Sequence, residues 1–481
     1  MALKSVLLSF DLLRRINSFQ DGIYQDVQSL KAALKPQSCS FFRYRPSIVS
    51  NHRTDLAGAD ALFAPWYAAY STSHIACLFQ HVKHAPNLLT KHAAYYGHVV
   101  VLEHLYGVCT PEVFNGLPLW DLAAANGHIH ILNFLHSIQF MPTNIVNCHH
   151  VPATNETMRV AAASGHLSVV AWLHSHNISF DPTDAQDVAA EFGHLDVLQW
   201  LYNHGVGEIT TWAMDKAAAN GHLHVLAWLY DHIPSAKCTT FAMDDAARNG
   251  HLDVLEWLLA HRKEGATVAS VRNAAEANHV DVLRWLLAHK ISPTTSPWAM
   301  ALAAQDGHLE AIQLLHEYDW PGTSRAMDKA AKHGFLGIVK WLHDHRRDGC
   351  TTSAIDDAAC EGHLEVVQWL HNHRDEGCTT KALDGAIQNG HNRVAWWLIE
   401  HRNEGCSARG IEFATQRGDL GLVQWFCRHR HVEVWRREAS IVVARTLDHH
   451  EIVSFLEWGQ PDNCPCSKCA SKHRPAFCTV Q

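Results

Sequence analysis

Histidine is the residue type of this chain that could most readily perform chemistry, because 39 of the 481 residues are histidines. Ten of them directly follow a glycine or asparagine that recurs through the sequence, from His98 to His391. A ladder of imidazoles could bind zinc, which needs three or four ligands about 2.0–2.1 Å from the ion. Equivalent residues of stacked helices, however, lie about 8–10 Å apart. We therefore interpret these histidines as structural residues that bond neighbouring backbone.

A second candidate metal site lies in residues 459–481, a Cys-rich tail that we expect to be flexible. Its spacing is Cys466-x2-Cys469-x3-His473-x4-Cys478, with Cys464 to spare. This spacing resembles a zinc knuckle that lacks one residue between Cys469 and His473 and lacks the usual glycine. Zinc at these four residues is the alternative to a tail without metal. We favour the tail without metal and expect no cofactor.

Sequence signatures of catalysis are absent. His450-Glu451 is followed by Ser454 at the position where a zinc peptidase helix needs its second histidine. The sequence has no Gly-x-Ser-x-Gly, no phosphate-binding loop and no dinucleotide-binding fingerprint. We therefore predict that the protein is not an enzyme.

The histidines belong to a repeat of 27 to 29 residues from Gly165 onward, and each copy predicts two antiparallel helices. In the copy CTTFAMDDAARNGHLDVLEWLLAHRKEG, residues 238–265, we expect a first helix over Phe241–Asn249, which Gly250 ends. We expect a second helix over Leu252–His261, whose apolar residues cover more than half of its circumference. So wide an apolar face needs a neighbour on each side. The sequence therefore predicts an all-α solenoid of stacked helical pairs.

The repeat resembles the ankyrin repeat. The resemblance rests on the Ala-Ala of the first helix, as in Ala246-Ala247, and on the opening Gly-His-Leu-acid-Val-Val/Leu of the second, as in GHLDVL at 250. It covers residues 59–458 as an array of about 12–13 units and implies a scaffold that binds proteins. The family's unit has about 33 residues, so we expect its β-hairpin finger to be reduced or absent. Ala-Met-Asp stands where the family has Thr-Pro-Leu-His, as at Asp215.

A second series of histidines ends the second helices, usually four residues after a tryptophan, as His261 follows Trp257. We predict that the tryptophans are core residues. We predict that the histidines meet the carbonyl groups exposed at the helix end. Three cysteines also follow the repeat, Cys350, Cys378 and Cys406, and at a spacing of 28 residues they lie too far apart for disulfides.

We expect the partner to bind the exposed, concave surface of the first helices, where side chains vary between repeats. Large aromatic and arginine side chains without a core role are typical of binding hot spots. The alternative is that the aromatic side chains fold back onto the adjacent loop. The predicted partner-binding residues are Trp212, Lys216, Phe241, Asp244, Asp245, Arg248, Trp298, Arg325, Lys329 and Lys332.

Residues 1–58 do not follow the repeat, and residues 7–30, LLSFDLLRRINSFQDGIYQDVQSL, resemble an F-box weakly. The favoured interpretation is an N-terminal helical cap that shields the first repeat. The F-box resemblance implies the alternative function, a substrate receptor of a cullin-type ubiquitin ligase.

Composition limits the partner further. The formal net charge is −9 and the charged residues are mixed along the chain, so we expect a protein partner and no nucleic acid. No run of eighteen apolar residues occurs, so we expect no membrane span. We predict a monomer of the cytoplasm, with the nucleus left open as an alternative.

Overall fold

The structure of the chain is a computed structural model. The residues that it describes are 19–20, 23–24, 27, 30, 48–82, 85–108, 114, 117–138, 154–178, 184–291, 294–429 and 437–458. They fall into two compact units, residues 1–239 and residues 240–481, which are described one at a time.

Residues 1–239 begin with elements that do not follow the repeat. Strands β1 (Phe19–Gln20) and β2 (Ile23–Tyr24) form an antiparallel pair with Phe19 opposite Tyr24. Helices α4 (Ile48–Tyr70) and α5 (Ile75–His81) follow. The expected boundary at residue 58 therefore falls inside α4. The two-residue strands are the only strands in the part that the structure describes, and they lie outside the repeats.

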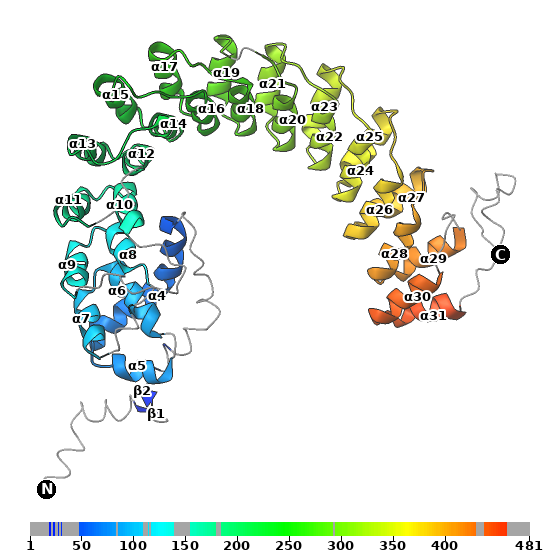
Figure 1. Cartoon of the computed structure of the whole chain (residues 1–481). Helices are drawn as coiled ribbons and strands as arrows, with labels where there is room; N and C mark the ends of the chain where they lie inside the picture. Colours follow the sequence, from blue (N-terminus) through cyan, green and yellow to red (C-terminus); the bar gives the residue numbers. More distant parts are fainter. Residues whose placement is uncertain are drawn as a thin grey trace, which may run out of the picture. The chain divides into compact units, whose positions relative to one another are not determined.

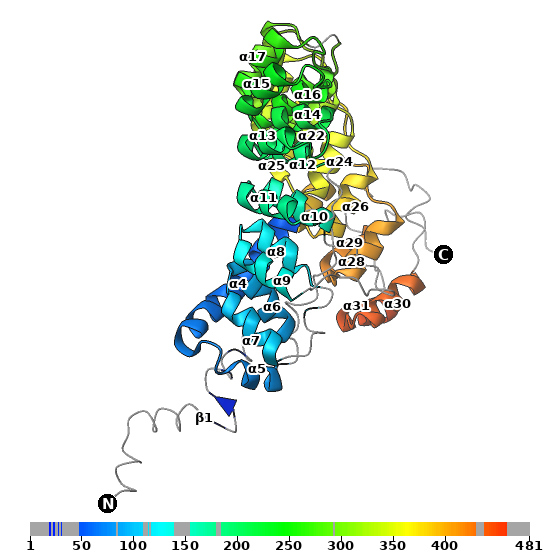
Figure 2. The ribbon, with the colours of Figure 1, turned by 60° about the vertical axis from the view of Figure 1, so that its left-hand side comes forward.

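Five helical pairs complete the described part of residues 1–239. Each first helix contacts the next first helix, and the second helices α7, α9, α11 and α13 contact one another in the same order. Neighbours such as α6 and α8 lie side by side in both views of the ribbon (Figures 1 and 2). The pairs are α6 (Ala85–Tyr96) with α7 (Val99–Val108), α8 (Leu119–Ala125) with α9 (Ile129–Ser137), α10 (Thr154–Ala163) with α11 (Leu167–Ser175), α12 (Ala185–Glu191) with α13 (Leu195–Asn203), and α14 (Thr211–Ala219) with α15 (Leu223–His232).

The described part of residues 240–481 contains eight further pairs, whose first and second helices form two rows (Figure 1). The pairs are α16 (Phe241–Asn249) with α17 (Leu252–His261), α18 (Val268–Glu276) with α19 (Val280–Ala288), α20 (Trp298–Gln305) with α21 (Leu309–Glu317), α22 (Arg325–Lys332) with α23 (Leu336–His345), α24 (Ser353–Cys360) with α25 (Leu364–His373), α26 (Thr380–Asn389) with α27 (Asn392–His401), α28 (Ala408–Gln416) with α29 (Leu420–His429), and α30 (Arg437–Thr446) with α31 (His450–Trp458).

The corner between the two helices of a pair depends on a left-handed residue. Gly250 has φ +83° and ends α16, and the N–H of His251 donates to the carbonyl of Ala246 at 3.0 Å. A side chain raises the energy of this conformation, so glycine is favoured there. Asn278 and Asp448 take the same position in two repeats, each with φ +58°.

The core is divided between the two rows of helices. The alanine pairs of the first helices, such as Ala246 and Ala247, are fully buried, and their small side chains let neighbouring first helices approach closely. The second helices bury aliphatic residues, such as Val254, Leu255 and Leu258 in α17. The interior of the array is therefore shared between neighbouring pairs, as the width of the apolar face predicts.

Candidate functional site

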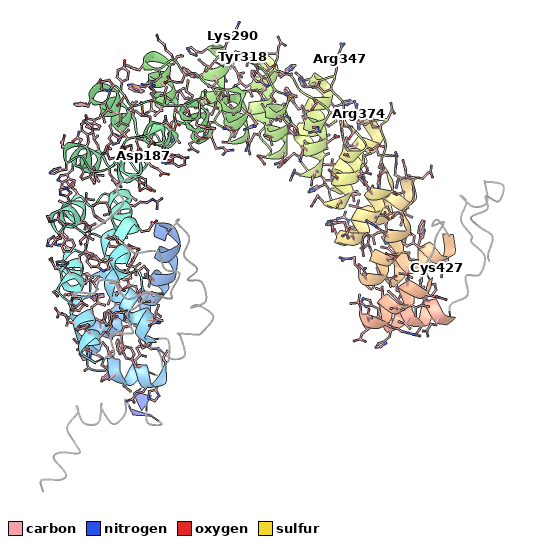
Figure 3. All side chains as sticks on the ribbon, in the orientation of Figure 1. Asp187, Lys290, Tyr318, Arg347, Arg374 and Cys427 are labelled. Atoms are coloured by element: carbon pink, nitrogen blue, oxygen red, sulfur yellow. The ribbon has the colours of Figure 1, made fainter. Side chains whose placement is uncertain are left out.

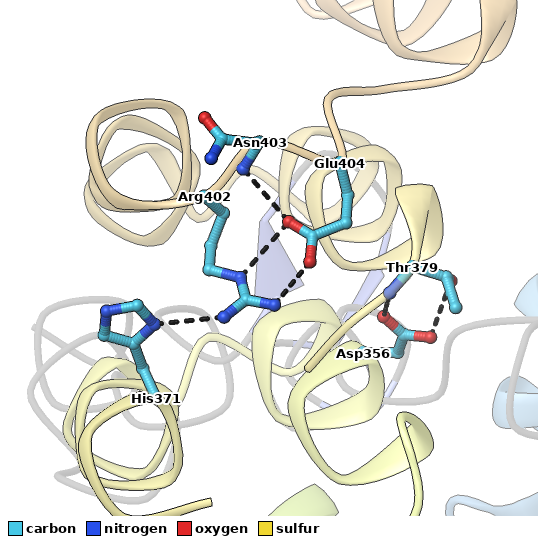
Figure 4. Close-up of polar contacts among 6 residues, drawn as sticks. All are labelled: Asp356, His371, Thr379, Arg402, Asn403 and Glu404. Carbon is cyan, nitrogen blue, oxygen red and sulfur yellow. Dashed lines mark hydrogen bonds and ion pairs between the residues drawn. The ribbon is translucent and has the colours of Figure 1, made fainter. Parts of the chain in front are cut away.

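In several repeats, an aspartate of the first helix forms hydrogen bonds with the next repeat. In α24, Asp356 accepts two hydrogen bonds from Thr379, one from the N–H and one from the hydroxyl, each at 2.7 Å (Figure 4). The same hydroxyl oxygen accepts the N–H of Lys381 at 3.2 Å, so Thr379 also caps α26. The equivalent pairs are Asp187–Thr210, Asp215–Thr239, Asp244–Thr267, Asp328–Thr351 and Asp384–Ser407.

The predicted placement of Asp244 on the exposed surface is wrong. Asp244 is only 3% exposed, and its carboxylate accepts the N–H of Thr267 at 2.9 Å and its hydroxyl at 2.6 Å. Burial raises the pKa of Asp244, and the two bonds from Thr267 oppose that rise. Asp187 has the same role in α12 (Figure 3). These aspartates hold the repeats together and are not available to a partner.

The histidine after the corner glycine forms a second joint between neighbouring repeats. The ring of His194 lies against Gly165 of the preceding repeat, and its Nε2 is 3.0 Å from the carbonyl of Ala163. His128 and His166 make the equivalent contacts at 2.9 Å and 3.0 Å. Burial lowers the pKa of His128, because it disfavours the charged imidazolium. The structural interpretation of this series is confirmed.

The histidines that end the second helices also have structural roles. The Nδ1 of His401 is 2.9 Å from the carbonyl of Trp397, and the two rings stack with centroids 4.5 Å apart. The predicted contact with helix-end carbonyls is therefore confirmed. The prediction that the tryptophans are core residues is too strong, because Trp397 and most of its equivalents are only half-buried. The stacked imidazole covers one face of the ring at the surface.

An arginine that follows the second helix contacts the second helix of the preceding repeat. Arg402 forms an ion pair with Glu404, and its Nη1 lies 3.2 Å from Nδ1 of His371 in α25 (Figure 4). Burial and the neighbouring charge of Arg402 lower the pKa of His371. Arg374, at the end of α25, forms the equivalent pair with Glu376 (Figure 3). These charged residues therefore pair within the array.

The described cysteines and histidines do not form a reactive or metal-binding centre. The described cysteines are free thiols. Burial raises the pKa of Cys350 and Cys406 to about 12, so these thiols stay protonated. In the described part of the chain, no three His, Cys, Asp or Glu side chains are grouped to hold a metal ion. The candidate zinc residues Cys466, Cys469, His473 and Cys478 lie outside the described residues.

Family models of ankyrin repeats match residues 186–271, 298–343 and 327–410. The chain contains ankyrin repeats. The comparison with solved structures finds the crystal structure of the human ASB11 ankyrin repeat domain, with 20% identity, a TM-score of 0.29, and coverage of 36% of this chain and 90% of that one. The comparison with curated proteins finds no match.

The ankyrin repeats confirm the predicted fold class, a helical solenoid of helix-turn-helix units. Strands are absent from the described connections between the repeats. Ankyrin repeats are generally binding modules without catalytic activity, so the chain is a scaffold for protein–protein interaction. None of the described helices combines the length and the apolar character needed to cross a lipid bilayer.

In residues 240–481, two of the first helices start with an exposed aromatic residue. Phe241 of α16 is 64% exposed, and Trp298 of α20 is 46% exposed. Arg325 of α22 lies over the ring of Trp298, with Cζ 4.5 Å from the ring centroid. In residues 1–239, Trp212 of α14 is 51% exposed, and Nζ of Lys216 lies over its ring, 4.6 Å from the ring centroid. The three aromatic residues are therefore accessible to a partner.

The remaining predicted residues of 240–481 lie farther along the first helices. Arg248 is exposed, whereas Asp245, Lys329 and Lys332 are half-buried. We define the first-position row as one residue, at the first or second position, of each of α16, α18, α20, α22, α24, α26 and α28. It consists of Phe241, Ala269, Trp298, Arg325, Ser353, Lys381 and Arg409. Lys381 and Arg409 are exposed cations that the predicted set omits, although the repeat register identifies them.

Proposed function

We propose that the protein binds a protein partner along the first helices of residues 240–481. Phe241, Trp298 and Arg325 of the first-position row would make the central contacts. The observation that carries the proposal is the exposure of Phe241, Trp298 and Arg325, because aromatic and arginine side chains without a core role are typical of binding hot spots.

The composition of the row also supports the proposal. The buried alanines and the aspartate joints recur between repeats, whereas the first position changes from aromatic to small to cationic. Stacking of the repeats therefore does not require any one residue type there. Trp298 and Arg325 come from neighbouring repeats, and their cation–π contact orients both groups before a partner arrives.

We expect the triple variant Phe241→Ala, Trp298→Ala and Arg325→Ala to capture much less of the partner protein than the unaltered chain. Removal of hot-spot side chains typically weakens binding tenfold or more. The measurement is capture from lysate by the purified full chain, quantified by mass spectrometry. The unfolding free energy should change by no more than about 1 kcal/mol, since the replaced side chains are exposed.

A matched control carries the same kinds of change on the second helices and at the end of one of them: Leu259→Ala, Tyr318→Ala and Lys340→Ala. These side chains are also exposed. The control should retain the proteins that the first triple loses. Equal loss in both variants, or unfolding of the first triple, would show that the first-position row is not the binding surface.

The assignment of Trp212, Lys216, Asp245, Arg248, Lys329 and Lys332 to the same interface stays a prediction. The F-box alternative also stays a prediction, because most of residues 7–30 lie outside the described part of the chain.

A further inference from the structure

We propose that the partner of the first-position row is an acidic segment of another protein that places an apolar side chain against Trp298. This inference rests on the proposed function and adds the chemical class of the partner. The acidic residues would lie along α22 to α28, toward Arg325, Lys381 and Arg409.

The charge of the row supports an acidic partner. Arg325, Lys381 and Arg409 are all exposed, and none of the seven residues of the row is acidic. Asp328, Asp356 and Asp384 on the same helices are engaged by threonine or serine. The remaining acids of these helices and their ends lie farther along, at Asp357, Glu361 and Glu412. The charged residues of the row itself are therefore all cations.

The helix dipole does not explain these cations. The first turn of a helix has a partial positive charge, so an acidic residue is favourable there and a basic one is unfavourable. Arg325 is the first residue of α22, and Lys381 and Arg409 are the second residues of α26 and α28. Each cation stands where the helix would gain from an aspartate or glutamate. Binding of an anionic group would offset this cost, because the positive end of the helix dipole and the neighbouring cation would then both attract that group.

Trp298 supplies the apolar part of the surface. Its ring is exposed on one side and contacts the guanidinium of Arg325 at 4.5 Å. A guanidinium held against an aromatic ring keeps its N–H groups available for bidentate bonds to a carboxylate. An acidic segment with one aromatic or aliphatic residue therefore matches the pair.

Two other occupants fit the surface less well. Nucleic acid requires a broad basic surface, whereas the chain has a net charge of −9 and its second helices expose acids such as Glu256, Glu310 and Glu365. The chain's own residues 459–481 contain Lys468, Lys472 and Arg474 against one acidic residue, Asp462. That segment has the wrong charge for this row.

The test selects short peptides from a random displayed library on the immobilised full chain. We expect the enriched peptides to be acidic and to contain an aromatic or aliphatic residue. An enriched peptide, remade and measured in solution, should bind the variant Lys381→Glu/Arg409→Glu about tenfold more weakly. The matched control Lys340→Glu/Arg393→Glu places the same charge changes on the second helices and should leave affinity within about twofold.

Each outcome has one meaning. Enriched peptides that are neutral or basic, equal losses in the two charge variants, or no enrichment would overturn the acidic partner. Duplex DNA that displaces the peptide and binds the chain as tightly as the peptide does, or more tightly, would also overturn the acidic partner. Non-acidic peptides that still require Trp298 would leave the proposed function standing without this inference. Peptides that bind Trp298→Ala as tightly as the unaltered chain would contradict the proposed function itself.

Discussion

Gly362→Ala should destabilise residues 240–481 strongly, by about 2–4 kcal/mol. Gly362 has φ +88°, which costs alanine about 1–2 kcal/mol. A Cβ atom there would also lie 2.5 Å from Nδ1 of His391, so the imidazole must leave its place against the preceding repeat. The measurement is the free energy of unfolding in urea, followed by circular dichroism.

Gly405→Ala is the matched control. Gly405 has φ +70°, but a Cβ atom there meets nothing within 4 Å. We expect this variant to show only the conformational cost of about 1–2 kcal/mol. Replacing His391 with alanine in the Gly362→Ala background should remove the collision, although it also removes the contacts of His391. Equal destabilisation by Gly362→Ala and Gly405→Ala would show that the glycine–histidine contact does not hold neighbouring repeats together.

Asp356→Ala should be the second large effect, with a loss of about 2–3 kcal/mol. The variant removes both acceptors of Thr379, whose N–H and hydroxyl each donate to Asp356 at 2.7 Å. Hydrogen bonds to a charged group contribute about 1.5–3 kcal/mol, and a donor left without its acceptor adds a cost. Urea unfolding of the variant measures the loss.

Asp357→Ala separates this effect from a general change of charge. Asp357 is the next residue of α24 and is half-buried, so its replacement should change stability by no more than about 0.5 kcal/mol. Asp356→Asn should lie between the two alanine variants, because the amide keeps one acceptor oxygen. If Asp356→Ala and Asp357→Ala were equally stable, the aspartate joint would contribute nothing to the array.

The repeat allowed much of the local structure to be predicted from sequence. The expected first helix over Phe241–Asn249 and second helix over Leu252–His261 are α16 and α17. Glycine fixes the corner and the apolar pattern fixes the buried faces, and both signals are local. The expected exposure of Phe241 and Trp298 is also observed.

Contacts between repeats were harder to predict. Asp244 lies at the angular position of an exposed residue on its own helix, but the start of the next first helix covers it with Thr267. Trp397 has the hydrophobicity of a core residue, yet its helix ends at the surface, where His401 stacks on it. The repeat spacing does not change between residues 239 and 240, where one compact unit ends and the other begins. For Asp244 the deciding information lies in a neighbouring element, the start of the next first helix.

The central functional claim is that a partner contacts the first helices of residues 240–481 rather than the second helices. Hydrogen–deuterium exchange of the full chain, alone and with the protein that the lysate comparison captures, tests it most directly. We predict slower exchange on binding at the beginnings of α16, α20 and α22, with little change in α17, α21 and α23. Slower exchange confined to the second helices would contradict the claim.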